Sequence, residues 1–506
     1  MTNLTADRVR ATLVASLAGN MGLAQVASLP TAVDVLEVRA DLLGDVDPEA
    51  LRRLFTGRLL YTLRSRGEGG ASDATGEARW ARLRAAASRF DLIDLEGERD
   101  LVPEVLAVIP VSKRVISWHG PASGRPLELV ARAQEYQRLG AALVKLVVFA
   151  ESSRDALEPL SALSSLAVAD RANVLAFAAG ACGTWTRLVA AHRGAPWLYL
   201  AAVDGGAEPA APGQPELRRW IADFDLPWLR PVEGLFGVVG RPITHSLSPR
   251  LHNRAYASLG LPYLYLPLHA DSLGDFWLDV VEDEVLPELG LPWRGFSATA
   301  PFKDAALGLA GASSPLADRL GSANTLVLRD GVWEADTTDA EGVVQALRSF
   351  AVEIDGRRAA VVGGGGAGRV AAAGLQGAGA LVVLFNRDPA RGAESATAAR
   401  VEYRPLGELD PAEFSILVQA TSLGRMASDP LPLPIDRVRP GSVVLDLVYG
   451  EEPTPLIRAA RERGALAIDG RYVLLEQARG QFRRMTGHEM DLDLGRQTLG
   501  LPEGGE

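Results

Sequence analysis

The chain has 506 residues, 47% of them hydrophobic, and a formal net charge of −11 at pH 7. This length predicts two to four domains, each with its own core. The composition is typical of a globular α/β protein and excludes fibrous and disordered classes. The negative charge argues against nucleic acid or an anionic membrane as the main partner, although it leaves room for a local basic pocket.

The chain contains a single cysteine, Cys182, and six histidines. One cysteine excludes an internal disulfide framework and fits a reducing compartment. No cysteine and histidine stand at metal-ligand spacing, so we expect no metal site and interpret Cys182 as a small buried thiol. We find no signal peptide, transit peptide or apolar run of membrane-spanning length. These features predict a cytoplasmic protein.

Eight short apolar runs recur through the first half of the chain, separated by segments of helical character such as 76–90 and 127–139. The runs are Leu13–Leu17, Val35–Val38, Leu59–Leu63, Leu92–Leu95, Val115–Trp118, Leu143–Phe149, Val174–Ala178 and Trp197–Val203. Alternating strands and helices of this number predict an α/β fold that closes into a (β/α)₈ TIM barrel. In such a barrel the reactive groups lie at the carboxyl ends of the strands.

The run Leu143–Phe149 contains a lysine among apolar residues. In a strand, Lys145, Val147 and Phe149 share one face, so the ammonium group points into an apolar interior. Because burial of an unpaired charge is costly, Lys145 should lose its proton. A neutral amine can attack a ketone and form an imine. The alternative is a strand-end lysine that extends its ammonium group to water.

Charged and polar side chains stand near the ends of the other runs. They are Ser16, Glu37, Arg39, Arg64, Glu96, His119 and, past the seventh run, Arg187. Such residues can form a solvated rim. Three arginines, a histidine and a lysine on one face instead favour an anion site with a base and a nucleophile.

Six motifs carry these residues: Val35–Asp41, Thr62–Gly70, Ser117–His119, Val144–Leu146, Gly183–Arg187 and Ala211–Gln214. In this order, over roughly residues 10–225, they resemble type I 3-dehydroquinate dehydratase. The resemblance implies that Lys145 forms an imine with the substrate ketone. It also implies that His119 removes and delivers protons while Glu68 orients it.

The same resemblance implies how the substrate is held. Arg187 would pair with its carboxylate, and the ring hydroxyls would contact Ser16, Glu37, Arg39, Arg64 and Gln214. Two departures stand beside this match: Ala210 replaces a lid serine, and Gly120-Pro121 follows His119 where many members place a polar residue.

The second half begins after Asp225–Pro231, which predicts a short, fairly rigid connection. The next segment, Gly237–Pro249, is typical of a strand, a turn and a helix. By themselves, Ser246 and Ser248 would be interpreted as turn or N-cap residues.

Further on, the buried strand Arg358–Val362 leads into a glycine-rich turn, an alanine-rich helix and a second strand, Ala380–Phe385. This order predicts a Rossmann lobe in which a pyrophosphate lies at a helix N-terminus. Arg387 stands where an acidic residue would mark NAD, which favours NADP. Asp388 beside it opposes that preference.

Seven motifs follow one another in this half: His245–Pro249, Gly295–Lys303, Ser322–Leu326, Thr337–Asp339, Ala420–Gly424, Asp446–Tyr449 and Leu475–Ala478. They resemble shikimate dehydrogenase over about residues 235–490. The resemblance implies that Lys303 and Asp339 move a proton while NADPH supplies hydride. Without it, Lys303 and Asp339 would be read as a plain salt bridge.

The resemblance also implies the ligand contacts of this half. The substrate would be bound by Ser246, Ser248, Thr299, Asn324, Tyr449 and Gln477. NADP(H) would be bound by Gly363, Gly365, Gly366, Ala367, Gly368, Asn386, Arg387, Thr421 and Ser422. The departures from the family pattern are Ser297, Thr337, Gln419 and Val473, and the Ser297 form resembles the plant two-domain dehydratase–dehydrogenase.

We therefore expect a bifunctional shikimate-pathway enzyme that converts 3-dehydroquinate to 3-dehydroshikimate and then to shikimate. Its predicted domains are a barrel over residues 1–230, a substrate-binding lobe over 234–345 completed by 471–500, and a Rossmann NADP-binding lobe over 346–470. Two alternatives remain: another lysine-imine lyase, such as an aldolase, fused to an NAD-linked quinate dehydrogenase, or a non-catalytic sensor of these metabolites.

Overall fold

The computed structural model describes residues 8–17, 23–202, 209–424, 428–450 and 452–502. The chain divides into two compact units. The first comprises Met1–Leu235 and Gly260–Trp293, and the second comprises Phe236–Leu259 and Arg294–Glu506. Within the described ranges, no helix is long and apolar enough to cross a membrane.

The first unit contains an eight-stranded sheet in the order β8-β7-β6-β5-β4-β3-β2-β9, and every pairing in it is parallel. The strands are β2 (Thr12–Leu17), β3 (Val35–Arg39), β4 (Arg58–Thr62), β5 (Leu92–Glu96), β6 (Arg114–Pro121), β7 (Leu143–Phe149), β8 (Val174–Ala179) and β9 (Trp197–Ala201). The eight predicted strands are confirmed, and Val203 of the last predicted run lies outside the described residues.

The predicted eight-stranded barrel is confirmed, and it is nearly closed. Among the described residues β8 and β9 form no strand pairing. At this seam Ala195 N donates to Val174 O at 2.9 Å, but Trp197 N then donates back to Ala195 O at 2.8 Å. Pro196 between them has no N–H to donate. The parallel ladder therefore stops after one bond.

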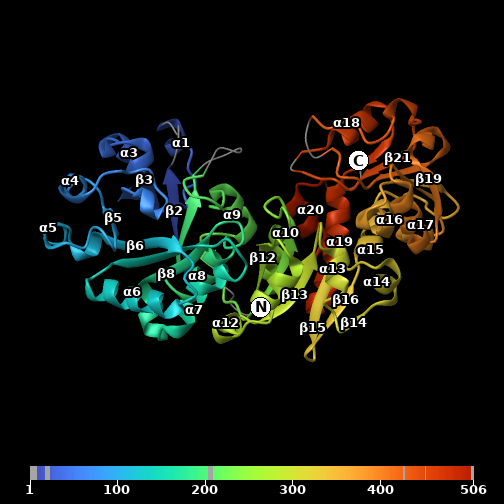
Figure 1. Cartoon of the computed structure of the whole chain (residues 1–506). Helices are drawn as coiled ribbons and strands as arrows, with labels where there is room; N and C mark the ends of the chain where they lie inside the picture. The colour runs from blue at the N-terminus through green and yellow to red at the C-terminus, as the bar shows by residue number, and fades with distance from the viewer. Residues whose placement is uncertain (1–7, 18–22, 203–208, 425–427, 451, 503–506) are drawn as a thin grey trace. The chain divides into compact units, whose positions relative to one another are not determined.

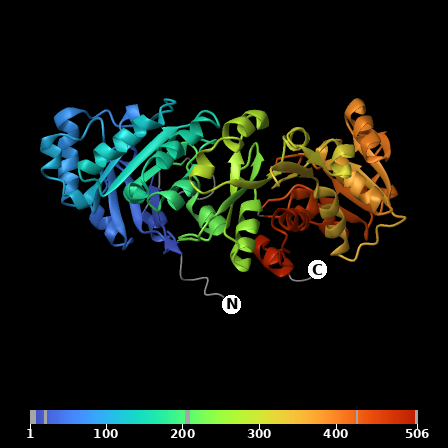
Figure 2. The same ribbon diagram turned by 90° about the horizontal axis from the view of Figure 1, so that it is seen from below.

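Helices lie outside the strands (Figures 1 and 2). They include α4 (Gly76–Ala87), α6 (Pro126–Arg138), α7 (Glu158–Ser165), α8 (Thr186–Arg193) and α9 (Leu217–Phe224), with the shorter α1 (Leu23–Ala27), α2 (Ala40–Leu43), α3 (Pro48–Arg52) and α5 (Pro103–Leu106). In α6 the buried residues Leu129, Ala133 and Tyr136 recur at helical spacing, so one stripe packs against the strands. The short strands β1 (Val9–Arg10) and β10 (Trp228–Leu229) pair antiparallel with each other.

A later segment also belongs to the first unit. It comprises β12 (Tyr263–His269), α11 (Leu273–Phe276), the π-helical turn Trp277–Val281 and α12 (Val285–Glu288). The Arg193 guanidinium at the end of α8 donates to Leu289 O at 2.7 Å. Arg154 pairs with Asp279 at 3.0 Å. Residues 260–293 are therefore held to the α7–α8 side of the barrel by specific contacts.

The second unit contains a mixed sheet in which strands follow the order β11-β13-β15-β16-β14. Their bounds are β11 (Gly234–Gly240), β13 (Trp293–Ala298), β14 (Ala312–Ser313), β15 (Thr325–Arg329) and β16 (Val332–Asp336). The helices around it are α10 (Ser248–Leu259), α13 (Lys303–Leu307), α14 (Pro315–Leu320), α15 (Asp339–Arg348), α19 (Gly470–Thr486) and α20 (Leu492–Leu499).

The C-terminal helices pack on this part of the chain. Helix α19 contacts α15 and α10, and α20 contacts α10. The rings of Tyr256 and Phe482 stack with their centroids 5.3 Å apart. These contacts agree with a substrate-binding lobe completed by 471–500, whose bounds stay a prediction.

A second sheet in this unit follows the order β19-β18-β17-β20-β21-β22 with every pairing parallel. Its strands are β17 (Arg358–Val362), β18 (Leu381–Asn386), β19 (Glu402–Pro405), β20 (Ile416–Gln419), β21 (Val443–Asp446) and β22 (Leu466–Ile468), with helices α16 (Gly366–Gly377), α17 (Pro389–Ala399) and α18 (Pro455–Glu462). Numbered along the chain, this order is 3-2-1-4-5-6, that of the Rossmann fold. The predicted Rossmann lobe is confirmed.

Glycines let the backbone around α16 pack closely. A Cβ on Gly368 would lie 1.9 Å from Gly363 O, and Gly363 has a φ of +118°. A Cβ on Gly374 would lie 2.7 Å from Ala340 O, because α16 packs against α15 at this point. The two helices therefore need a residue without a side chain at position 374.

We predict that Gly374→Ala destabilises the second unit by about 1–3 kcal/mol, because the added methyl group overlaps the α15 backbone. Gly377→Ala is the matched control, since nothing lies within 4 Å of its added Cβ. Denaturant unfolding of the two variants measures the difference. Equal stability of both would show that α15 and α16 are not in close contact.

Candidate active sites

Lys145 lies in the middle of β7 rather than at its end, and its side chain is buried with 5% of the residue exposed. Its Nζ lies 3.8 Å from Glu37 Oε1 and 3.8 Å from the centre of the Tyr199 ring. Burial lowers the pKa of Lys145, whereas the Glu37 carboxylate opposes that change. The predicted burial of this lysine is confirmed, and the neutral amine is the form that an imine requires.

His119 lies on the neighbouring strand β6 and contacts Glu68. His119 Nδ1 is 3.0 Å from Glu68 Oε2, and the His119 backbone N–H donates to the same oxygen at 3.1 Å. Burial, with the positive charge of Arg64, holds the pKa of His119 well below its usual range. A neutral imidazole that donates from Nδ1 leaves Nε2 free to accept a proton. The geometry therefore fits a base oriented by Glu68.

Glu68 is itself buried, and burial raises its pKa to about 8, with Arg64 opposing the rise. Its Oε2 accepts from His119 and, at 2.9 Å, from Arg64 Nη1, while the buried Oε1 has no hydrogen-bond partner. A proton held by Glu68 would therefore sit on Oε1. In either protonation state Oε2 remains the acceptor that fixes the His119 ring.

Arg64 lies at the centre of a buried carboxylate cluster. Its Nη2 donates to Asp94 at 2.8 Å, and its Nη1 lies 3.4 Å from Glu96. Ser117 also accepts from Nη1 at 3.0 Å. Burial alone would lower the pKa of Arg64, but the carboxylates raise it above its ordinary value. Arg64 therefore orders Glu68, and its predicted contact with a substrate hydroxyl stays a prediction.

Arg187, the second residue of α8, has a different environment. Its residue is 3% exposed, its guanidinium lies 4.6 Å from the Phe177 ring centre, and Nη1 donates to Ala178 O at 3.2 Å. Within the described residues no carboxylate pairs with it, and its Nε has no partner. Burial lowers the pKa of Arg187 to about 9. A buried cation without a counter-ion fits an anionic ligand group.

Three of the remaining predicted barrel residues form a hydrogen-bonded chain, and Arg39 has separate partners. Gln214 donates to Ser16 at 2.9 Å, and Ser16 donates to Glu37 at 2.5 Å. Arg39 pairs with Asp41 at 2.8 Å and donates to the backbone oxygen of Ala210 at 2.8 Å. Ala210, which replaces the lid serine of the family, is thus held in place through its backbone oxygen.

Two residues of the site were missed by the sequence reasoning. Tyr199 lies in β9, with its ring beside Lys145 and its hydroxyl buried without a hydrogen-bond partner. Asp94, in β5, accepts from Arg64 and Ser117. Both alternate with apolar residues inside predicted strands, and that period-two pattern could have assigned them to the barrel interior.

In the second unit, Lys303 and Asp339 meet from positions 36 residues apart, with Nζ 2.5 Å from Asp339 Oδ2. Asn324 donates to the other carboxylate oxygen at 2.7 Å. The backbone N–H of Thr338 in turn donates to Asn324 Oδ1 at 2.9 Å. Asp339 is thus fixed on both oxygens, and Lys303 is held at one of them.

The other predicted substrate residues occupy distinct elements. Ser248 begins α10, and its N–H approaches Ser246 Oγ at 3.3 Å. Thr299 follows β13, Tyr449 follows β21 and both are half-buried. Gln477 lies in α19 so close to α15 that a Cβ on Gly342, one turn from Asp339, would be 3.0 Å from its Cβ.

The glycine-rich turn joins β17 to α16, whose N-cap is Gly365. Gly364 N donates to Asn386 Oδ1 at 3.0 Å, which ties the turn to the end of β18. A Cβ on Gly364 would approach the Asn386 side chain at 3.0 Å. Arg387 is exposed directly after β18. This arrangement fits a pyrophosphate at the N-terminus of α16 with a further phosphate near Arg387.

Two residues beside the glycine-rich turn, Asp388 and Gln419, have structural roles. Asp388 is the N-cap of α17, and its carboxylate accepts from Ala390 N at 3.0 Å, so it has a structural partner rather than standing free beside Arg387. Gln419 is fully buried, and it accepts from Thr421 N at 2.6 Å and donates to Leu423 O at 2.8 Å. Gln419 therefore shapes the turn that carries the predicted cofactor residues Thr421 and Ser422.

Arg391, in the first turn of α17, was also missed. Its Nη2 lies 3.6 Å from the position that a Cβ on Gly365 would occupy. A guanidinium facing the glycine-rich turn can contact a phosphate group bound there. The sequence feature that could have indicated Arg391 is its position, four residues after Arg387 on the helix that follows β18.

The barrel with its buried lysine, and the Rossmann lobe beside a paired lysine and aspartate, fit as a class an imine-forming lyase joined to a dinucleotide-dependent oxidoreductase. Residues 13–220 match the family model of type I 3-dehydroquinase, and residues 238–326 match that of the shikimate dehydrogenase substrate binding domain.

Several known proteins are similar to the chain. Shikimate dehydrogenase (NADP(+)) of Rubrobacter xylanophilus is 38% identical over 275 residues, which cover 52% of this chain and 95% of that protein. The chloroplastic bifunctional 3-dehydroquinate dehydratase/shikimate dehydrogenase of Arabidopsis thaliana is 29% identical over 485 residues, covering 90% of this chain and 78% of that protein. A solved shikimate dehydrogenase from Aquifex aeolicus is 28% identical, covers 53% of this chain and 97% of its own, and has a TM-score of 0.49.

The chain therefore belongs to the shikimate dehydrogenase family, and its first half is a type I 3-dehydroquinase domain.

We predict that Glu37→Gln moves the acid limb of dehydration to lower pH. The Glu37 carboxylate favours the ammonium form of Lys145, so its removal lowers the pKa further and the reactive neutral amine persists at lower pH. The shape of the pH–rate profile measures this shift separately from the absolute rate. Thr62→Val, which removes only a hydrogen bond to Glu37, is the control. An unchanged or upward-shifted limb would contradict the role of Glu37.

We predict that Arg387→Ala weakens binding of NADP far more than binding of NAD. Loss of a charged hydrogen-bonded contact should cost roughly 1.5–3 kcal/mol. Calorimetric titration with both nucleotides measures this difference, and Arg439→Ala provides an exposed control in the same lobe. If the unchanged protein bound the two nucleotides with equal affinity, the assigned contact between Arg387 and the phosphate that distinguishes NADP from NAD would be contradicted.

Proposed function

We propose that the chain is a bifunctional enzyme that dehydrates 3-dehydroquinate to 3-dehydroshikimate in its barrel and reduces 3-dehydroshikimate to shikimate in its second unit. One arrangement in each unit carries the proposal: in the first, a buried lysine on the strand next to a histidine held by Glu68, and in the second, a lysine hydrogen-bonded to a fixed carboxylate. The family membership of both halves supports it.

Dehydration begins when neutral Lys145 Nζ attacks the substrate ketone and water leaves, giving an imine that is an electron sink. His119 Nε2 removes a proton from the neighbouring carbon and then delivers it to the departing hydroxyl. Water hydrolyses the imine and returns the lysine as a free amine. Glu68 keeps the His119 ring oriented through both proton transfers.

Substrate binding in the barrel rests on Arg187. Its buried guanidinium lacks a carboxylate partner among the described residues, and a substrate carboxylate would supply one. The chain Gln214–Ser16–Glu37 and the Arg39 guanidinium offer hydrogen bonds to ring hydroxyls. These contacts would set the ketone against Lys145 and the acidic carbon against His119.

In the second unit, NADPH supplies the hydride. Lys303 donates a proton to the oxygen on which negative charge develops, and Asp339 keeps Lys303 directed at that oxygen. Ser246 and Ser248 would bind the carboxylate, with Thr299, Asn324, Tyr449 and Gln477 around the ring. The cofactor would be held by Gly363, Gly365, Gly366, Ala367, Gly368, Asn386, Arg387, Thr421 and Ser422.

Two alternatives are less well supported. A different imine-forming lyase would not need an unpaired buried arginine, and an NAD-linked dehydrogenase would not favour arginine at position 387. A sensor without activity would not need the Lys145–His119 and Lys303–Asp339 pairs. We place the protein in the cytoplasm because a single cysteine suits a reducing compartment.

A coupled assay tests both activities in one protein. With 3-dehydroquinate and NADPH, the unchanged chain should produce shikimate. Lys303→Ala should lower turnover of 3-dehydroshikimate by about 10²-fold or more, as expected for a lost general acid, while NADPH binding and dehydration remain. Lys145→Ala should abolish dehydration and leave reduction of added 3-dehydroshikimate intact.

Two outcomes would overturn these assignments. If Lys303→Ala raised only KM and kept full kcat, the lysine would be a binding residue. If either variant abolished both activities while remaining folded, the two reactions would not belong to separate sites.

A further inference from the structure

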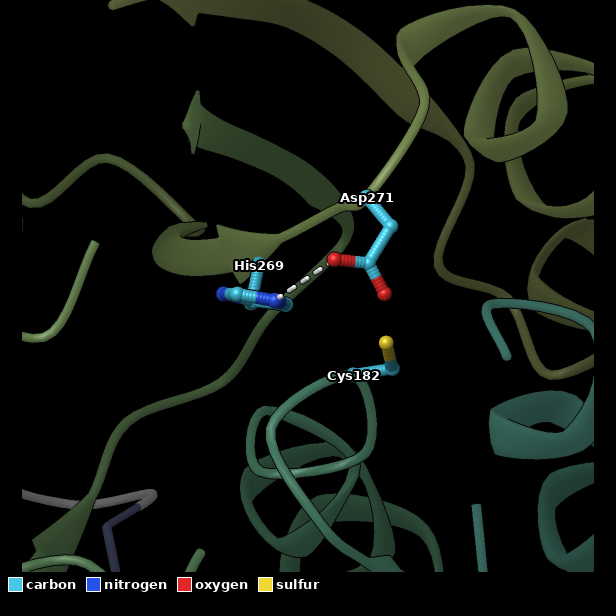
Figure 3. A group of neighbouring side chains, drawn as sticks. All are labelled: Cys182, His269 and Asp271. Carbon is cyan, nitrogen blue, oxygen red and sulfur yellow. Dashed lines mark ion pairs between the residues drawn. The ribbon is translucent and has the colours of Figure 1, made fainter. Parts of the chain in front are cut away.

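One cluster of metal-binding side-chain types occurs among the described residues, and the proposed function does not use it. It comprises Cys182, in the loop between β8 and α8, His269, the last residue of β12, and Asp271 just beyond it. The three ligand atoms lie within 4.8 Å of one another (Figure 3). His269 Nε2 is 3.6 Å from Asp271 Oδ1. The cluster joins two segments of the first unit that are far apart in sequence.

The surroundings of Cys182 favour a cation. The thiol is buried, with 5% of the residue exposed, and it forms no disulfide. The Asp271 carboxylate oxygen lies within 4.8 Å of the Cys182 sulfur. A reactive cysteine needs the opposite, a positive environment that stabilises the thiolate. A carboxylate beside a buried thiol instead creates a negative potential that a bound cation would neutralise.

We propose that Cys182, His269 and Asp271 bind a divalent cation of the zinc class. Thiolate, imidazole and carboxylate are ligands that zinc accepts together, and a tetrahedral site with three protein ligands takes water as its fourth. The Asp271 side chain is 63% exposed, which leaves one side of the cluster open to that water. As the metal–sulfur bond forms, the thiol proton is released to solvent.

The cation would tie the β8–α8 loop to the end of β12. Cys182 precedes the segment that leads to Arg187, the second residue of α8. Other contacts hold neighbouring parts of the chain together, since Arg193 at the end of α8 donates to Leu289 O and the rings of Trp185 and Trp293 lie 6.0 Å apart. The metal ion would therefore link these two segments, and it takes no part in the proposed catalytic steps.

Cobalt provides a direct probe, because a thiolate ligand gives cobalt a charge-transfer absorption that oxygen and nitrogen ligands alone do not give. The full chain, reduced and treated with a chelator, is titrated with Co²⁺ and then with Zn²⁺. We expect one equivalent of Co²⁺ to produce the band and Zn²⁺ to remove it. The band should be lost in Cys182→Ser and strongly weakened in His269→Ala and Asp271→Asn.

His488→Ala is the matched control, because this exposed histidine lies outside the cluster, and it should keep the band. Asp271→Asn changes a largely exposed side chain, so it tests the site without disturbing the fold, which circular dichroism verifies. Absence of the band from the unchanged chain would overturn the proposal. Full retention of the band in both His269→Ala and Asp271→Asn would also overturn it, because the metal would then bind Cys182 without the other two ligands.

Discussion

Burial of the Lys145 amine is the interaction on which the first half of the molecule depends. An ammonium group inside a barrel is disfavoured, so the amine is biased towards the neutral form that attacks a ketone. Glu37 lies near enough to moderate this effect without forming a close pair. The barrel therefore supplies both the low-dielectric interior that lowers the pKa of Lys145 and the strand that fixes its position.

The same interior must hold several other charges, and their pairing explains the polar residues inside the strands. Arg64 is surrounded by Glu68, Asp94 and Glu96, and Arg79 pairs with Asp100 at 2.7 Å. Buried charges that are paired and hydrogen-bonded are tolerated, whereas loss of one partner is strongly destabilising. Arg187 is the exception among these arginines, since no carboxylate in the described part of the chain balances it. That imbalance supports the proposal that Arg187 binds an anionic group of the substrate.

The few lysines of the chain likewise differ in their roles. The sequence contains only three lysines, Lys113, Lys145 and Lys303, and the rest of its lysine and arginine positions are arginine. Lys113 has a structural role, since its Nζ donates to the carbonyls of Ala87 and Phe90 at the end of α4. The other two are the lysines to which we assign catalytic roles, and those roles need an amine that can lose its proton, which a guanidinium cannot do.

Much of this arrangement could be predicted from sequence, because it depends on local pattern. Apolar runs located the eight barrel strands, the glycine-rich turn located the Rossmann lobe, and family motifs identified Lys145, His119, Lys303 and Asp339. The features that could not be predicted from sequence depend on contacts between segments that are far apart in the chain. The ring of Tyr199 beside Lys145, the capping role of Asp388 and the approach of Cys182 to His269 and Asp271 arise only when separate elements pack together.

The central claim, that a neutral Lys145 forms an imine with the substrate, can be tested by borohydride trapping. Borohydride reduces an imine to a stable secondary amine, so treatment in the presence of 3-dehydroquinate should leave a covalent adduct that peptide mass spectrometry can locate. With only three lysines in the chain, the other two are internal controls. The account predicts an adduct on Lys145 and none on Lys113 or Lys303. An adduct on either of those lysines, or substrate turnover without any adduct, would contradict it.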